Sequence, residues 1–82
     1  MNNTQIKAGI NEFKSEVGQL QLSILRANRV LPRHQAWNHE IWIKSEYLRY
    51  ETFGLDAADR VAATKVIKAT QSELARTLFG RI

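Results

Sequence analysis

The 82-residue sequence contains no cysteine. The fold therefore has neither a disulfide nor a thiolate-bound metal, two devices that commonly reinforce domains of this size. A chain this short also buries only about 60–65% of the surface that its unfolded form exposes, so its stability margin is small. Stability must therefore come from helix packing or from self-association, and we predict a homo-oligomer. A chain without cysteine suits a reducing interior, and we expect a cytoplasmic protein.

Long apolar runs and the motifs of catalysis are also missing. The first residues, Met1–Thr4, lead into an amphipathic stretch, which is typical of neither a signal peptide nor a membrane span. The sequence has no glycine-rich phosphate loop and no serine nucleophile elbow. His34 and His39 are separated by about 140° around a helix and cannot converge on one metal ion by local spacing, so we expect neutral histidines that are exposed or half-buried. We therefore expect no enzymatic activity, cofactor, metal or membrane partner.

Proline and glycine are scarce, and two of them mark boundaries. Pro32 and Gly54 fall where the apolar periodicity resets, and they divide the chain into three segments. None of these segments alternates apolar and polar residues as a half-buried strand does. Pro32 suits the first turn of a helix, Gly54 suits the residue after a helix, and Asp56 suits the N-cap of the next helix.

These boundaries predict an all-α fold. We expect either a three-helix up-down-up bundle or a helical hairpin with a long first helix. The chain would form a single helical domain over residues 1–82, with helices at about 4–29, 33–53 and 56–79. The third helix would face the core with an apolar stripe formed by Ala63, Ile67, Leu74 and Leu78.

Apolar residues in the first segment recur with spacings that alternate between four and three. They are Ile6, Ile10, Phe13, Val17, Leu20, Ile24, Ala27 and Leu31. This pattern is a heptad seam, with the β-branched Ile10, Val17 and Ile24 at positions that favour two-stranded supercoils. Monomeric bundles pack through the same ridges. Because the seam is short and its flanking charges are mixed, we favour a bundle and keep self-association through this helix as the alternative.

The central segment, residues 31–54, holds five of the seven aromatic residues and has two apolar faces on a helical wheel. One face carries Trp37, Ile41 and Leu48; the opposite face carries Ala36, Ile43, Tyr47 and Tyr50, with Trp42 and Phe53 on a flank. A helix that is apolar around most of its circumference has neighbours on several sides. Either the other two segments cover both faces, or part of the aromatic surface contacts a second subunit or a target protein. The predicted partner-binding residues are Trp37, Trp42, Tyr47, Tyr50 and Phe53.

Acidic residues are missing between Glu16 and Glu40, in a chain whose net charge is +4. An up-down-up bundle would gather at one end a basic pole made of Arg26, Arg29, Arg33, Arg76 and Arg81. Basic side chains at helix C-termini complement the helix dipole, but Arg33 lies at a helix start, where the dipole disfavours it. The carboxylates Glu40, Glu46 and Glu51 are expected on the solvated face of the central helix.

Two functions fit these patterns. The leading prediction is a small non-enzymatic adaptor, regulator or inhibitor that binds a protein partner through the aromatic central helix, as a homo-oligomer. The alternative is a nucleic-acid- or nucleotide-binding protein that uses the basic pole, because arginines that neutralise phosphates supply much of the affinity in such complexes.

Overall fold

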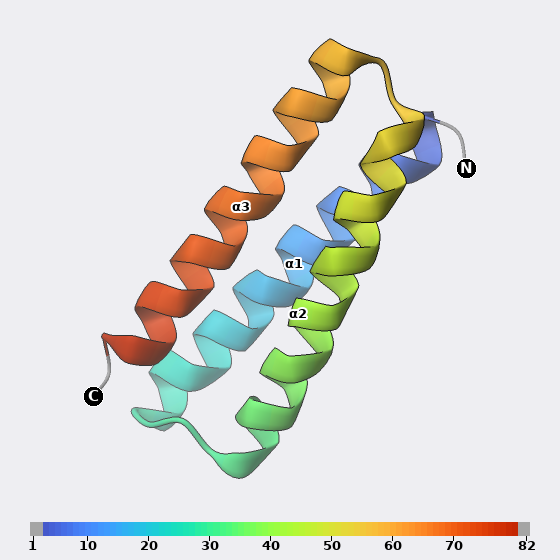
Figure 1. Cartoon of the computed structure of the whole chain (residues 1–82). Helices are drawn as coiled ribbons and strands as arrows, with labels where there is room; N and C mark the ends of the chain where they lie inside the picture. Colours follow the sequence, from blue (N-terminus) through green and yellow to red (C-terminus); the bar gives the residue numbers. More distant parts are fainter. Residues whose placement is uncertain (1–2, 81–82) are drawn as a thin grey trace.

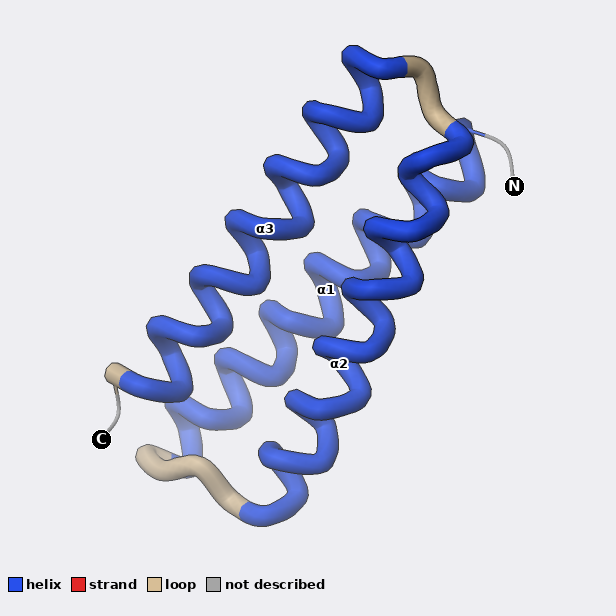
Figure 2. The backbone as a smooth tube through the Cα atoms, viewed as in Figure 1, coloured by secondary structure: helices blue, strands red, loops and turns tan. Residues whose placement is uncertain are grey.

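Three long helices make up the computed structural model, which describes residues 3–80 (Figure 1). They are α1 (Asn3–Ala27), α2 (Pro32–Glu51) and α3 (Ala57–Phe79), and a short 3-10 turn, η1 (Thr52–Gly54), follows α2. Consecutive helices run in opposite directions, each helix packs against the other two, and no strand occurs in the described residues (Figure 2). The bundle measures 41 × 18 × 15 Å. The all-α prediction is confirmed, and of the two predicted architectures the chain adopts the up-down-up bundle.

The core is organised around α1. The heptad seam of this helix contributes the buried residues Ile6, Ile10, Phe13, Val17, Leu20 and Ile24, none of which is more than 7% exposed. α2 adds Ile41 and Leu48, and α3 adds Ile67 and Leu74. The two remaining residues of the predicted α3 stripe, Ala63 and Leu78, pack against this cluster. The seam is therefore covered by the chain's own α2 and α3, as the bundle interpretation predicts, and it is not free to pair with a second chain.

Two backbone features form the turn between α1 and α2. Asn28 adopts the left-handed conformation, with a φ of 56°, and this ends α1 before the predicted boundary at residue 29. Leu31 is extended, and Pro32 is the first helical residue of α2, as predicted.

The imidazole of His34 ties this turn to α1. His34 is fully buried, so the prediction of an exposed or half-buried histidine was wrong. Its Nδ1 accepts a hydrogen bond from the backbone N–H of Leu31 (3.1 Å), and its Nε2 lies 2.8 Å from Oγ of Ser23. A neutral imidazole that accepts at Nδ1 carries its proton on Nε2, so Nε2 donates to the Ser23 hydroxyl. The polar ring is satisfied on both sides, which is how a buried histidine is accommodated.

The connection between α2 and α3 differs in detail from the prediction. α2 ends at Glu51 and continues into η1, and Gly54 lacks the positive φ of a helix-terminating glycine. The hydroxyl of the buried Thr52 donates to the carbonyl of Arg49 (2.6 Å), so it fastens the start of η1 to the last turn of α2. Asp56 is the N-cap of α3, as predicted, but its side chain makes no capping hydrogen bond.

Candidate functional site

The second apolar face of α2 is open to solvent. Ile43 is 45% exposed, Tyr47 69% and Tyr50 78%, whereas Ile41 and Leu48 on the opposite face are buried. The three exposed residues recur at positions i, i+4 and i+7, so they form one line along the helix, which we call the stripe. α1 and α3 therefore cover only one face of α2, so the alternative in which the chain itself buries both faces is wrong. Contact of the open face with a second subunit or a target protein stays a prediction.

The five predicted partner-binding aromatics fall into two groups. Trp37 and Trp42 are half-buried, and Trp37 packs against the core. Tyr47 and Tyr50 belong to the stripe, and Phe53 is 70% exposed at the end of α2. The Phe53 ring meets the Tyr50 ring edge to face, with centroids 6.2 Å apart and an interplanar angle of 76°. The exposed aromatic surface therefore extends from the middle of α2 into η1.

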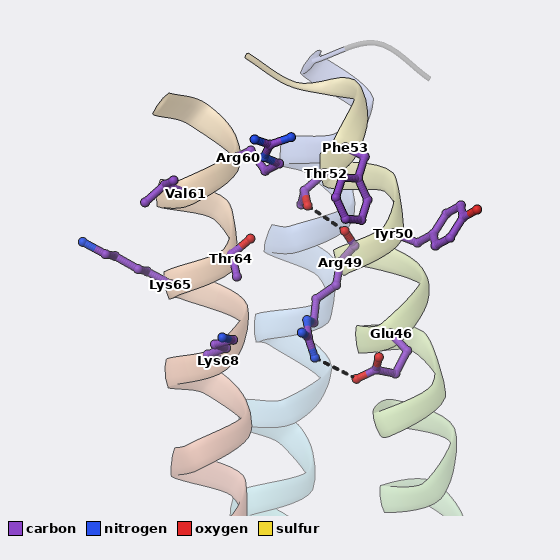
Figure 3. A pocket seen from close by; sticks show the side chains of 10 residues that line it. All are labelled: Glu46, Arg49, Tyr50, Thr52, Phe53, Arg60, Val61, Thr64, Lys65 and Lys68. Atoms are coloured by element: carbon purple, nitrogen blue, oxygen red, sulfur yellow. Dashed lines mark hydrogen bonds and ion pairs between the residues drawn. The ribbon is translucent and has the colours of Figure 1, made fainter. Parts of the chain in front are cut away.

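On one side of the stripe lies an open groove of 530 Å³ between α2 and α3 (Figure 3). Four cationic side chains line it and are named here the basic flank: Arg49, Arg60, Lys65 and Lys68. Arg49 pairs with Glu46 (3.2 Å), and the Arg60 guanidinium lies 5.7 Å from the centroid of the Phe53 ring. The other cations of this flank have no ion pair within residues 3–80. The groove as a whole therefore carries a net positive charge, although the carboxylate of Glu46 lies between its cations and the stripe.

The side of the stripe that faces α1 has the opposite charge. A second hollow, between α1 and α2, is lined by three carboxylates that we call the acidic flank: Glu12, Glu40 and Glu51. The same hollow contains a single cation, Lys44, whose Nζ lies 2.6 Å from Glu16 and 3.8 Å from Glu12. The hydrogen bond to Glu16 raises the pKa of Lys44, against the smaller effect of burial. Glu40 and Glu46 are exposed as predicted, and Glu51 is half-buried.

Four arginines of the predicted basic pole come together at one end of the bundle. Arg26, Arg29, Arg33 and Arg76 are exposed and lie at the end of α1, in the following turn, at the start of α2 and near the end of α3 (Figure 1). Arg26 and Arg33 line one hollow together with the half-buried Trp37. Arg81 lies outside the described residues.

The described part of the chain holds no cluster of three or more residues suited to a metal ion. His34 is buried in the α1–α2 turn and His39 is exposed, so the two imidazoles do not converge. No helix within residues 3–80 has the length and hydrophobicity that a membrane span requires.

Comparison with known proteins gives no match to a protein-family model, to a curated protein or to a solved structure.

The two charged flanks were not predicted from the sequence, because each combines residues of two helices that meet only in the bundle. A partial signal for the basic flank was present, since Lys65 and Lys68 are three apart and share one helix face.

Proposed function

We propose that the protein is a small non-enzymatic adaptor, regulator or inhibitor that acts by binding protein through the stripe on α2, and that it works as a homo-oligomer. The exposed stripe of Ile43, Tyr47 and Tyr50 is the observation that supports this proposal. Exposed apolar surface rimmed by polar residues is typical of protein-binding sites on small folds. Here the rim consists of the two charged flanks.

The chemistry of the stripe suits a protein partner. Aromatic side chains dominate interface energetics because each buries about 150–250 Å² with little loss of side-chain freedom. Residues at i, i+4 and i+7 are the anchors with which a helix enters a groove or packs on another helix. In the free chain, Tyr47 and Tyr50 are too exposed to contribute much to folding. A partner that covers them would remove this apolar surface from water, which stabilises the complex.

The test uses a triple variant, Ile43→Ser, Tyr47→Ser and Tyr50→Ser, as the bait in affinity capture from the source cells. A control bait carries Leu22→Ser and Leu25→Ser, which change side chains of similar exposure, 52% and 49%, on α1. We expect both variants to stay folded by circular dichroism, and only the triple variant to lose bound protein and self-association. If the triple variant retains the mass and the captured proteins of the control, the stripe is not an interface and the proposal fails.

A second candidate function is favoured by the gathering of four exposed arginines at one end of the bundle. We propose, as the alternative, that this basic pole binds nucleic acid through its phosphates. About four phosphate contacts would give a slope of log affinity on log salt near −3.6. A double variant, Arg29→Gln with Arg33→Gln, should make that slope less steep, from about −3.6 to about −1.8. The change should be the same for unrelated base sequences, because phosphate contacts do not read the bases.

The control for the alternative is Lys7→Gln with Lys14→Gln, which removes two exposed cations from the side of α1 that faces α3, away from the basic pole. This variant should leave the salt slope unchanged. Failure of the unmodified protein to bind nucleic acid at roughly 50 mM salt, where counterion release favours binding most, would remove the alternative.

A further inference from the structure

We propose that the hollow at the basic pole holds an unpaired base of a single-stranded nucleic acid. This inference rests on the alternative function proposed above, and it deepens that function by naming the form of nucleic acid. The hollow has a volume of 540 Å³, lies between the second half of α1 and the first turns of α2, and is called here the pole hollow. The residues that carry the inference are Leu22, Ser23, Arg26, Arg33 and Trp37, all of which line it.

Two arginines stand on opposite walls of the pole hollow, Arg26 on α1 and Arg33 on α2. The hydrogen bond between Ser23 and His34 (2.8 Å) joins the two walls close to them. Among residues 3–80, neither arginine has an ion pair, and no carboxylate lines this hollow. The next carboxylate along α2, Glu40, is about 10 Å beyond Arg33 and lines a different hollow. A phosphate bound between the two guanidinium groups would therefore meet no competing acid and would relieve their mutual repulsion.

Trp37 and Leu22 supply an apolar surface beside the arginines. Trp37 is half-buried: it packs against the core, and it also lines the pole hollow. Leu22, on the α1 wall, is a large apolar side chain that is 52% exposed. Cations that hold the phosphates and aromatic side chains that hold the bases are the two parts of a site for single strands. A base within a duplex is paired and stacked on its neighbours, so it cannot enter such a hollow.

The Ser23 hydroxyl adds a hydrogen-bond donor to the pole hollow. Its Oγ accepts a hydrogen bond from Nε2 of His34, because Nδ1 of the same ring already accepts from the Leu31 N–H. A hydroxyl that accepts can still donate its own proton. Within the part of the chain that the structure describes, the Ser23 hydroxyl donates to no other group. Its proton is therefore available to an oxygen of a bound nucleotide, and the buried His34 keeps it so.

Binding to strands with and without bases tests the inference. The probes are a short single-stranded oligonucleotide of mixed sequence and an abasic strand with the same sugar–phosphate backbone, both at roughly 50 mM salt. We expect the unmodified chain to bind the strand with bases roughly tenfold more tightly than the abasic strand. Trp37→Leu should abolish this preference without changing the salt slope, because it removes stacking and no phosphate contact. Trp37→Phe should retain part of the preference.

A second variant avoids the core contacts of Trp37. Leu22→Glu changes a half-exposed side chain, so the fold should persist by circular dichroism, and it places a carboxylate in the pole hollow. We expect this variant to lose the preference for bases. The matched control is Leu25→Glu, which adds the same charge to α1 at a side chain that is 49% exposed and does not line the hollow. The control should retain the preference. If Trp37→Leu fails to fold, Leu22→Glu against Leu25→Glu decides the test.

The outcomes separate this inference from the functions proposed above. Equal affinity of the unmodified chain for both strands, or an unchanged preference in the folded Leu22→Glu variant, overturns the inference. The alternative function would still hold in that case, because the arginines of the basic pole would bind phosphates alone. An unmodified chain that binds neither strand at roughly 50 mM salt overturns both the inference and the alternative, and leaves the protein-binding proposal unaffected.

Discussion

Two glycines within α1 provide a matched pair of substitutions whose effects the packing predicts to differ. Glycine in a helix interior is about 1 kcal/mol less favourable than alanine. At Gly18, an added Cβ would meet no heavy atom within 4 Å. Gly18→Ala should therefore gain most of this difference and raise the free energy of unfolding by about 0.5–1 kcal/mol, which corresponds to a rise in Tm of several degrees for a domain of this size.

At Gly9 the same change meets an obstacle. The added Cβ would lie 3.0 Å from Cδ2 of Leu48, closer than the 3.5–4.0 Å at which two carbons attract best. Leu48 is only 6% exposed and belongs to the core, so its side chain has little room to move away. Overpacking costs roughly 1–3 kcal/mol, which equals or exceeds the helix-propensity gain. We expect Gly9→Ala to leave stability unchanged or to lower it.

Urea and thermal unfolding of both variants, followed by circular dichroism at one protein concentration, decides between the two cases. Equal concentrations are needed because association shifts the apparent stability. A Gly9→Ala variant that is stabilised as much as Gly18→Ala would refute the close packing of α1 on α2 at this point.

Three further predictions concern stability. Leu20→Ala should lower the free energy of unfolding by about 2–5 kcal/mol, because Leu20 is 0% exposed. Leu22→Ala, on the exposed side of the same helix, should change it by less than about 0.5 kcal/mol. Equal losses in urea unfolding would contradict the assigned core face. His34→Leu removes both hydrogen bonds of the buried imidazole and should cost about 1–3 kcal/mol in the same assay, and a neutral result would show that these bonds are not formed. The raised pKa of Lys44 means that the folded state favours its protonated form, so its stabilising contribution is complete below the ordinary lysine value of about 10.4 and is lost as pH rises through the raised pKa. Lys44 is 42% exposed, so this contribution should stay below about 1 kcal/mol, and Lys44→Gln should lack that part of the alkaline loss in unfolding experiments.

Much of the fold could be predicted from local patterns. The alternating spacing along α1 identified the residues that become its buried seam, because a helix repeats its faces every three to four positions. Pro32 fixed the start of α2 because its ring restricts both its own φ and the residue before it. Gly54 was a weaker guide. A glycine permits a left-handed helix end without requiring one. Here Gly54 has no positive φ, and the chain continues from α2 into the 3-10 turn η1.

The candidate site could be predicted only in part. The helical wheel placed Ile43, Tyr47 and Tyr50 on one face, and that face is exposed. The wheel could not show whether a neighbouring helix covers the face, since that depends on where α1 and α3 pack around α2. The charged flanks arise from the same packing, so residues far apart in sequence, such as Glu12 and Glu51, meet in one hollow. The prediction for His34 was wrong for a related reason, because its hydrogen-bond partners, Ser23 and Leu31, lie in another helix and in the turn.

The mass of the protein in solution tests most directly whether the stripe is an interface. Sedimentation equilibrium of the unmodified chain and of Tyr47→Lys should be measured from roughly 1 µM to 1 mM, the range of moderate protein affinities. We predict that the unmodified chain rises from 9.4 kDa towards twice that mass, and that Tyr47→Lys stays folded at 9.4 kDa. An unmodified chain that remains at 9.4 kDa throughout, or a Tyr47→Lys variant that dimerises as the unmodified chain does, would contradict a self-associating stripe.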